Sequence, residues 1–249
     1  MATVAALWRH PIKSHGREAI ERVVLTEGEA LPWDRHWAVT HTQSKFDPAD
    51  PAWVSCRNFA IGTLNPALAG LWATLDEGSG QITLRHADLG TLTFAPDDAA
   101  DVARFVDWIN QLDLRTPATG IASLPGRGFT DDSRPTVTLM NTASHTAVEG
   151  FHGGPLEKER WRGNIWLDGL APWEEFDWID SDVQIGEAVI RPHKRTERCM
   201  HTTANPHTGQ RDADTLAALR NGFGHQDFGI AGVVVKSGRI ALGDTVSVL

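Results

Sequence analysis

The chain of 249 residues is 41% hydrophobic and 22% charged, a composition typical of a folded globular protein with one large or two small domains. Its formal net charge of −9 argues against nucleic acid or an anionic membrane surface as the main partner. No apolar run reaches the roughly 18 residues of a membrane-spanning helix. Two distant cysteines and the absence of a secretory signal lead us to expect a reducing, cytoplasmic location.

Short β-type runs broken by Gly, Pro and Asp dominate the first part of the chain. They lie at residues 4–8, 23–25, 37–40, 81–84 and 91–94, and predict an antiparallel barrel or sandwich. One amphipathic helix follows them. Asp97 and Asp98 offer its amino terminus, and apolar residues then recur on a single face at Val102, Phe105, Val106, Ile109 and Leu112.

A stretch rich in Pro, Gly and Asp over residues 124–135 precedes a second set of predicted strands at 137–140, 164–167, 183–185 and 188–190. The carboxyl terminus predicts a hairpin of residues 232–236 and 239–242, followed by a strand at 245–249. We therefore expect two domains, residues 1–120 and 121–249. The predicted class is α+β and β-rich.

Cys199 follows four cations within eight residues: Arg191, Lys194, Arg195 and Arg198. Nearby positive charge favours thiolate over thiol, so the pattern predicts a sulfur that can attack electrophiles or bind a soft metal. An inert buried cysteine is the alternative. The turn signals at residues 205–209 argue against a core strand here and favour the reactive thiol.

The familiar site motifs are missing. The sequence contains no G-x-x-x-x-G-K-[ST], G-x-G-x-x-G, H-E-x-x-H or paired C-x-x-C pattern, so phosphate-loop, dinucleotide and zinc-hydrolase sites lose their usual support. A zinc site formed by His193, Cys199, His201 and His207 is a weak alternative, because the spacing is irregular.

Residues 198–209, RCMHTTANPHTG, resemble the R-C-x-x-T-T-x-D-P-x-T-G signature of the MOSC superfamily, named for the carboxy-terminal domain of molybdenum cofactor sulfurase. Three further blocks occur in the family's order. Residues 10–14 resemble its Y-P-I-K-S block, residues 33–37 its D-R-x-W block, and residues 162–165 its R-P-N-[IL] block. The resemblance extends over nearly the whole chain, and four ordered blocks are far more specific than one.

The resemblance implies the two-part form of the family, an amino-terminal β-barrel-like domain packed on a MOSC β-barrel domain with a few helices. The two-part form is similar to the mitochondrial amidoxime reducing component and its bacterial relatives. Such proteins bind the molybdenum cofactor (Mo-molybdopterin) through a cysteine thiolate and reduce N-hydroxylated compounds. The position that matches this catalytic, metal-binding cysteine is Cys199.

Other functional positions follow from the same resemblance. Lys13, Ser14 and Arg35 match residues that hold the cofactor phosphate, and a cation, a hydroxyl and a guanidinium suit a phosphate monoester. Arg162 and Asn164 match a pair near the cofactor, and a strand would direct both side chains to one face. The remaining expected cofactor-binding residues are Arg57, Asn141, Ser144, Arg198, Thr202 and Thr203. Cys56 matches a family alanine, and we interpret it as a packing residue.

The chain departs from the family pattern at three positions. His10 replaces a tyrosine, Gly163 replaces the proline of the R-P-N block, and Asn205 replaces the aspartate before Pro206. Since Asn205 removes a carboxylate from the loop after Cys199, the local geometry could differ there.

The expected electron supply is external. The sequence carries no dinucleotide fingerprint, no flavin signature and too few cysteines for an iron–sulfur cluster. We therefore expect a separate donor protein, either ferredoxin-like or cytochrome b5-like with its reductase. Two alternatives stay open: a sulfur or persulfide carrier that uses Cys199, and a cofactor carrier without catalysis.

Overall fold

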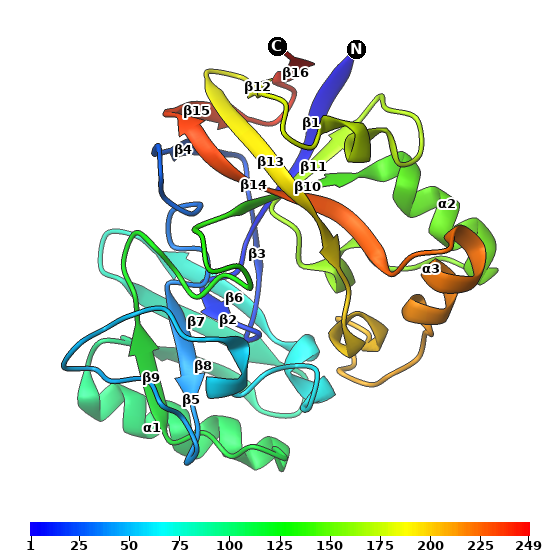
Figure 1. The fold of residues 1–249 in the computed structure, drawn as a ribbon. Coiled ribbons are helices and arrows are strands. Elements are labelled where there is room, and N and C mark those ends of the chain that lie inside the picture. Colours follow the sequence, from blue (N-terminus) through cyan, green and yellow to red (C-terminus); the bar gives the residue numbers. More distant parts are fainter.

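Strands dominate the fold, and three α-helices accompany them, so the predicted β-rich α+β class is confirmed. The computed structural model describes all 249 residues. Figure 1 shows strands of the carboxy-terminal half and helices α2 (Thr142–His152) and α3 (Thr215–Phe223) in one lobe. Most strands between residues 12 and 123 lie in the other lobe with α1 (Ala99–Ile109). None of the helices is both long and apolar enough to cross a membrane.

Seven strands close into a barrel. Their order is β11 (Ile165–Asp168), β10 (Val137–Asn141), β14 (Asp227–Lys236), β13 (Ala188–Glu197), β12 (Val183–Ile185), β16 (Thr245–Val248) and β1 (Ala2–Arg9). Pairing of β1 with β11 completes the circle, and β3 (Glu18–Ile20) extends the sheet beyond β1. Closure leaves the barrel itself without open edges.

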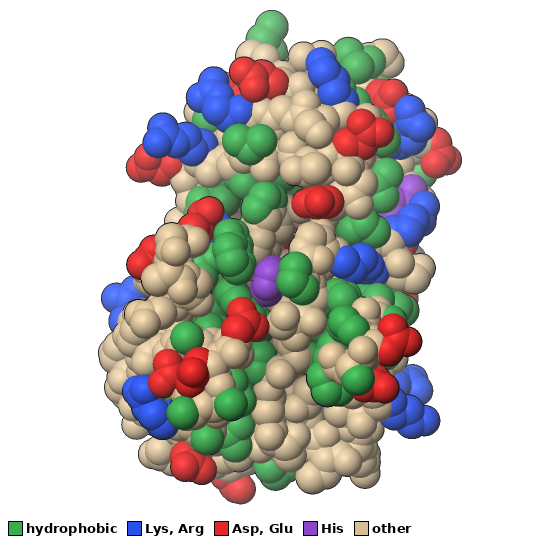
Figure 2. All heavy atoms as spheres, turned by 90° about the vertical axis from the view of Figure 1, so that its left-hand side faces the viewer, with side chains coloured by type: hydrophobic (Ala, Val, Ile, Leu, Met, Phe, Trp, Pro, Cys, Tyr) green, Lys and Arg blue, Asp and Glu red, His purple; other side chains and the backbone are tan.

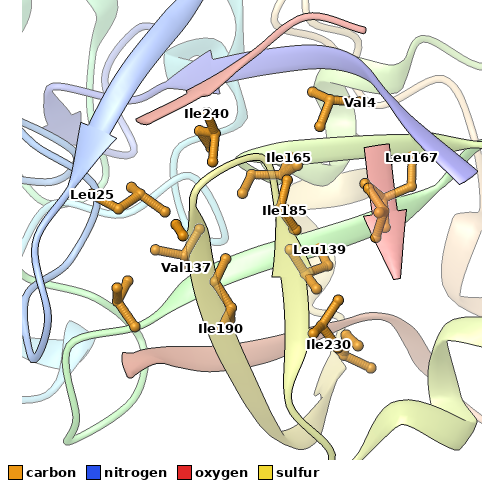
Figure 3. Close-up of a cluster of buried hydrophobic side chains, with 14 of the residues drawn as sticks. Val4, Leu25, Val137, Leu139, Ile165, Leu167, Ile185, Ile190, Ile230 and Ile240 are labelled. Atoms are coloured by element: carbon orange, nitrogen blue, oxygen red, sulfur yellow. The ribbon is translucent and has the colours of Figure 1, made fainter. Parts of the chain in front are cut away.

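Aliphatic side chains fill the barrel. Figure 3 shows them converging from its strands, and those labelled from the barrel strands are Val4, Val137, Leu139, Ile165, Leu167, Ile185, Ile190 and Ile230. Nearly all are fully buried. Because alternate residues of a strand face the same side, the β-branched residues that favour strands also provide this core.

The amino-terminal lobe contains two small sheets and α1. One sheet is the meander β6 (Trp72–Asp76), β7 (Gln81–His86) and β8 (Gly90–Phe94); the other joins β2 (Ile12–Lys13), β5 (Trp37–Thr40) and β9 (Gly120–Ser123). The Asp98 carboxylate caps α1 by accepting hydrogen bonds from two backbone amides of its first turn. Phe105 and Ile109 of α1 are fully buried, which confirms the helix predicted from the apolar spacing.

Strand pairing does not separate the two halves of the chain. Strand β1 pairs within the carboxy-terminal barrel, while β9, which contains residues 120 and 121, pairs with β5 of the amino-terminal lobe. Strand β4 (Arg22–Leu25) pairs with β15 (Gly238–Ala241). The predicted carboxy-terminal hairpin is therefore wrong: β14 pairs with β13 and β10, and β15 takes β4 as its partner.

Two of the three α-helices had no sequence prediction. Asn141 caps α2 and Asp214 caps α3, each by accepting a hydrogen bond from a backbone amide of the first turn. Short 3-10 turns complete the structure at Cys56–Asn58, Pro66–Gly70, Asn110–Leu112, Lys158–Trp161, Glu174–Trp178 and Met200–Thr203.

Buried Arg17 links the two lobes. Its guanidinium donates to the carbonyl oxygens of Ala69 at 2.6 Å and Leu71 at 2.9 Å, and to that of Pro206 in the other half of the chain. The guanidinium also lies 3.9 Å from the ring centroid of Trp72.

On the face of the molecule that Figure 2 shows, charged side chains of both signs are interspersed.

Gly163 packs against fully buried Met140. A Cβ atom at position 163 would overlap Cγ and Sδ of Met140. The Met140 side chain also packs with Trp161, Trp166 and Phe228. Met140 thus occupies the volume that a side chain at position 163 would need, which explains how this chain accommodates a glycine at this point.

We expect Gly163→Ala to lower the free energy of unfolding by about 1–3 kcal/mol, because the added methyl group overpacks a filled core. Met140→Ala should relieve this strain, so the double variant should be more stable than the sum of the single effects indicates. Denaturant unfolding of all four proteins of the cycle measures the coupling. Simple additivity would contradict the steric relation between the two residues.

Candidate functional site

A cavity of about 870 Å³ is lined by residues from both halves of the chain. Nine of the twelve predicted site residues line it: Lys13, Ser14, Arg35, Arg57, Arg162, Asn164, Arg198, Cys199 and Thr202. The structure therefore brings together positions that are up to 189 residues apart in the sequence, since Lys13 and Thr202 line the same cavity. Lining residues include eight Lys or Arg side chains and four Asp or Glu side chains.

Cys199 lies immediately before a 3-10 turn, and its thiol is exposed. The Thr63 hydroxyl donates a hydrogen bond to Sγ of Cys199 over 3.1 Å. The second thiol, Cys56, is half-buried and lines the same cavity. Burial raises the pKa of the Cys56 thiol. The interpretation of Cys56 as a packing residue alone is thus too narrow, because it forms part of the cavity wall.

The four cations that precede Cys199 do not form one cluster around it. Arg191 points elsewhere and forms a bidentate ion pair with Asp182, with N–O distances of 2.6 and 2.8 Å. Lys194, Arg195 and Arg198 line the cavity. Strand β13 carries Arg191, Lys194 and Arg195, and its pairing with β14 shifts register between Pro192 and Lys194. The sequence therefore overstates the positive charge next to the thiol.

Arg198, the nearest of these cations in sequence, is buried and holds the surrounding backbone. Its Nε donates to the carbonyl oxygen of Phe228 at 2.8 Å, and Nη1 donates to that of Trp161 at 2.7 Å. Burial lowers the pKa of Arg198 to about 10, so the guanidinium is still charged at neutral pH. Its hydrogen bonds fix the segment that leads into Cys199.

The amino-terminal half contributes Lys13, whose Nζ is buried and donates to the carbonyl oxygen of Phe129 at 2.8 Å and to the carboxylate of Asp131. Asp131 has an exposed side chain that faces the cavity. The surrounding cavity walls would raise the pKa of Asp131 by desolvation, but Lys13 and Arg35 outweigh this effect and hold that pKa well below its usual range. Asp131 therefore contributes a negative charge to the cavity wall beside Lys13.

Arg35 and Arg162 are packed together. Arg35 Nη2 donates to the Arg162 carbonyl oxygen over 3.0 Å, and Nη1 binds the fully buried carboxylate of Asp34. Arg162 Nη1 donates to the carbonyl oxygen of Gly16 over 3.1 Å, while Nη2 is buried without a partner. Burial and the charges of Arg35 and Arg17 lower the pKa of Arg162 to about 9.

Three residues of the cavity have a left-handed backbone although they are not glycine: Ser14 with φ 62°, Arg35 with φ 53° and Arg162 with φ 50°. Such conformations cost on the order of 1 kcal/mol or more each and persist where the surroundings impose them. The hydroxyl of Ser14 and the guanidinium of exposed Arg57 form no hydrogen bond within the chain. Both groups are therefore available to a ligand.

Asn164 and Thr202 line the cavity through side chains that the fold already holds. Asn164 Oδ1 accepts hydrogen bonds from the Thr138 amide at 3.1 Å and its hydroxyl at 2.9 Å. Thr202 and Thr215 hydroxyls lie 2.6 Å apart. Strand β11 begins only at Ile165, so Asn164 precedes the strand on which the sequence analysis placed it.

Asn141, Ser144 and Thr203 do not line the cavity. Asn141 Nδ2 donates to the buried Glu175 carboxylate over 2.6 Å, and the Ser144 hydroxyl donates to the same group over 3.0 Å. Burial raises the pKa of Glu175. The Thr203 hydroxyl donates to the Met200 carbonyl oxygen over 2.8 Å. The predicted role of these three residues toward the cofactor stays a prediction.

Two departures from the family pattern have local partners. Buried His10 donates its backbone amide to Asp34 over 2.7 Å, and burial lowers the pKa of His10 to about 3. Asn205 Oδ1 accepts two backbone amides of the following turn, while Nδ2 donates to Glu157 at 3.2 Å and Asp212 at 2.7 Å. An aspartate at position 205 would place a third carboxylate there, which explains the asparagine.

His201 packs directly over Gly62, where a Cβ atom would overlap the imidazole ring. Burial holds the pKa of His201 well below its usual value, so the ring is neutral at pH 7. No three His, Cys, Asp or Glu side chains are grouped to hold a metal ion. No motif in the sequence drew attention to Gly62 or Thr63, although both contact the segment of Cys199.

Comparisons with known proteins cover both halves of the chain. The MOSC N-terminal beta barrel domain model matches residues 1–116, and the MOSC domain model matches residues 128–247. The molybdenum cofactor sulfurase of Drosophila grimshawi is 36% identical over 95 residues, which represent 37% of this chain and 12% of that protein. The match therefore spans only a small part of that relative.

Two solved structures are similar at low sequence identity. The YuaD protein from Bacillus subtilis matches over 99% of this chain and 94% of its own, with a TM-score of 0.49 and 13% identity. YiiM from Geobacillus stearothermophilus matches over 45% of this chain and 53% of its own, with a TM-score of 0.36 and 18% identity. By the two domain matches, in this order, the chain belongs to the MOSC family in its two-part form.

Proposed function

We propose that the protein binds the molybdenum cofactor and reduces N-hydroxylated compounds, with Cys199 as the metal ligand. The family relation links the chain to molybdenum cofactor proteins. One observation carries the proposal: the same cavity contains the Cys199 thiol and cations from distant segments, Lys13, Arg35, Arg57 and Arg162. A thiolate suits a soft metal, and the cations suit a phosphate.

The residues of the cavity fit such a ligand. Arg162 Nη2 is buried without a hydrogen-bond acceptor, and a buried unsatisfied donor is costly unless a ligand supplies that acceptor. Phosphate oxygens would satisfy it and would also accept from Ser14 and Arg57. The volume of about 870 Å³ lies within the range of cofactor sites in proteins.

The bound cofactor would supply two-electron redox chemistry at its metal. The chain's own residues supply position and charge. Lys13, Arg35 and Arg162 hold positive charge in a buried wall, where it offsets the anionic ligand. Cys199 offers its sulfur to the same cavity, and neutral His201 provides a polar surface without adding charge.

The proposed electron donor is a separate cytoplasmic protein, ferredoxin-like or cytochrome b5-like. Lys194 and Arg195 line the cavity, and the Lys194 side chain is 47% exposed although it pairs with Asp132 over 2.6 Å. Such cations can steer an acidic partner toward the cavity despite the net charge of −9.

A sulfur-carrier function is the second candidate, and Cys56 favours it. Two thiols in one cavity provide a persulfide donor and an acceptor without further residues. Metal analysis separates this function from the first. Turnover of an N-hydroxylated substrate by the metal-loaded protein separates a reductase from a cofactor carrier.

The protein purified from a host that makes abundant cofactor should contain about one molybdenum and one pterin phosphate per chain. Cys199→Ser should abolish reduction of a hydroxylamine-type substrate while the fold stays intact, because serine provides no soft thiolate. Cys56→Ser is the matched control in the same cavity and should change turnover little. Molybdenum analysis, circular dichroism and dye-linked assays provide the readouts. Negligible molybdenum in the wild type, or full activity of Cys199→Ser, would contradict the proposal.

Arg57→Ala should weaken cofactor binding roughly tenfold, the effect of losing one charged hydrogen bond, and should leave the thermal midpoint unchanged. Arg35→Ala should lose both occupancy and stability, since it leaves the buried Asp34 carboxylate without its guanidinium partner. Arg104→Ala, which removes an exposed arginine on α1, is the control. Unchanged cofactor content in Arg57→Ala would remove Arg57 from the binding site.

The cofactor-loaded chain should reduce an N-hydroxylated substrate with reduced viologen and show no turnover with NADH or NADPH alone. Added salt should slow turnover with a donor protein more than with viologen, because screening weakens steering between proteins. Steady-state rates at low and high ionic strength test both points. Robust NADPH-driven turnover by the isolated chain would exclude the proposed external donor.

A further inference from the structure

A loop of the amino-terminal lobe, residues 61–65, lies directly on the segment that carries Cys199. The backbone at Gly62 supports the ring of His201, with no space for a side chain. The Thr63 hydroxyl donates to Sγ of Cys199 over 3.1 Å. The Thr63 carbonyl oxygen accepts a hydrogen bond of 2.7 Å from Arg211 Nη2. Three separate contacts thus join this loop to the metal-binding segment.

The loop is held in place by its own hydrogen bonds. The backbone amides of Leu64 and Asn65 both donate to the carbonyl oxygen of Ile61 over 3.1 Å. The buried side-chain amide of Asn65 donates through Nδ2 to the same oxygen over 3.1 Å and to the Thr116 hydroxyl over 2.8 Å. Thr63 therefore lies in a turn that hydrogen bonds hold in place, and this backbone fixes the position of its short side chain next to Sγ of Cys199.

Arg211 fixes the other side of the contact. Its Nη1 donates to the Met200 carbonyl oxygen and to the Thr203 hydroxyl, which lie one and four residues after Cys199 in the sequence. The same guanidinium holds Thr63 through Nη2. One planar group therefore sets the distance between the Thr63 turn and the segment of Cys199.

We propose that Thr63 is a positioning residue for the metal-binding sulfur: its hydroxyl orients Sγ of Cys199 and donates a hydrogen bond to it. This inference rests on the proposed function. A hydrogen bond to a ligating sulfur withdraws electron density from it and reduces its donation to the metal. The reduced metal is then relatively stabilised, and hydrogen bonds to ligating sulfurs are known to set metal potentials in this way.

The experiment compares Thr63→Val, which keeps the shape and loses the hydroxyl, with Thr63→Ser, which keeps the hydroxyl. Both are prepared as full-length, molybdenum-loaded proteins. Thr93→Val removes a hydroxyl from the outer sheet of the same lobe, where Thr93 meets Thr83 over 2.8 Å, and is the matched control. The readouts are molybdenum content, the midpoint potential of the metal and its electron paramagnetic resonance spectrum.

Thr63→Val should shift the midpoint potential to a more negative value and change the resonance spectrum, with molybdenum content within about twofold of the wild type. Thr63→Ser and Thr93→Val should both match the wild type. If molybdenum-loaded Thr63→Val has the wild-type potential and spectrum, the inference about Thr63 is wrong, while the proposed function stands. A wild-type protein without molybdenum would overturn the proposed function, and this inference with it.

Discussion

The cavity depends on cations that the fold forces close together at the junction of its two lobes. Arg35 contacts the backbone of Arg162, and their mutual repulsion adds to burial in lowering the pKa of Arg162 to about 9. The charges of Asp34 and Asp131 oppose this effect only in part, since the pKa of Arg162 stays lowered, and Arg162 Nη2 has no acceptor. The positive charge is thus organised by the fold itself, and under the proposed function this lowers the cost of organising the site when the anionic cofactor binds.

This arrangement requires both halves of the chain. Strand β1 completes the carboxy-terminal barrel, β4 pairs with β15, and Arg17 binds the carbonyl oxygen of Pro206 across the junction. Residues 128–247 match the MOSC domain, yet Lys13, Arg35 and Thr63 lie outside that segment. A carboxy-terminal domain alone would lack the barrel's closing strand as well as seven of the 26 residues that line the cavity.

The sequence allowed us to predict features that depend on local residue patterns, but not features that depend on which distant segments pair. The apolar spacing of α1 and the ordered family blocks led to elements and cavity residues that the structure also contains. The partner of β15 could not be predicted, because a strand edge is satisfied by any compatible strand, however distant. Thr63 was missed for a related reason, because only the fold brings its hydroxyl next to Sγ of Cys199, which is 136 residues away in the sequence.

The departures from the family pattern illustrate how such contacts compensate one another. Gly163 lacks the side chain of the usual proline, and Met140 fills the space beside it. Asn205 lacks a carboxylate, and its amide donates instead to Glu157 and Asp212. Each change is matched by a neighbour's volume or charge, so neither leaves a void or an unpaired charge beside the Cys199 segment. These contacts explain how the chain holds the thiol and the cations in one cavity although it differs from the family pattern at the two positions.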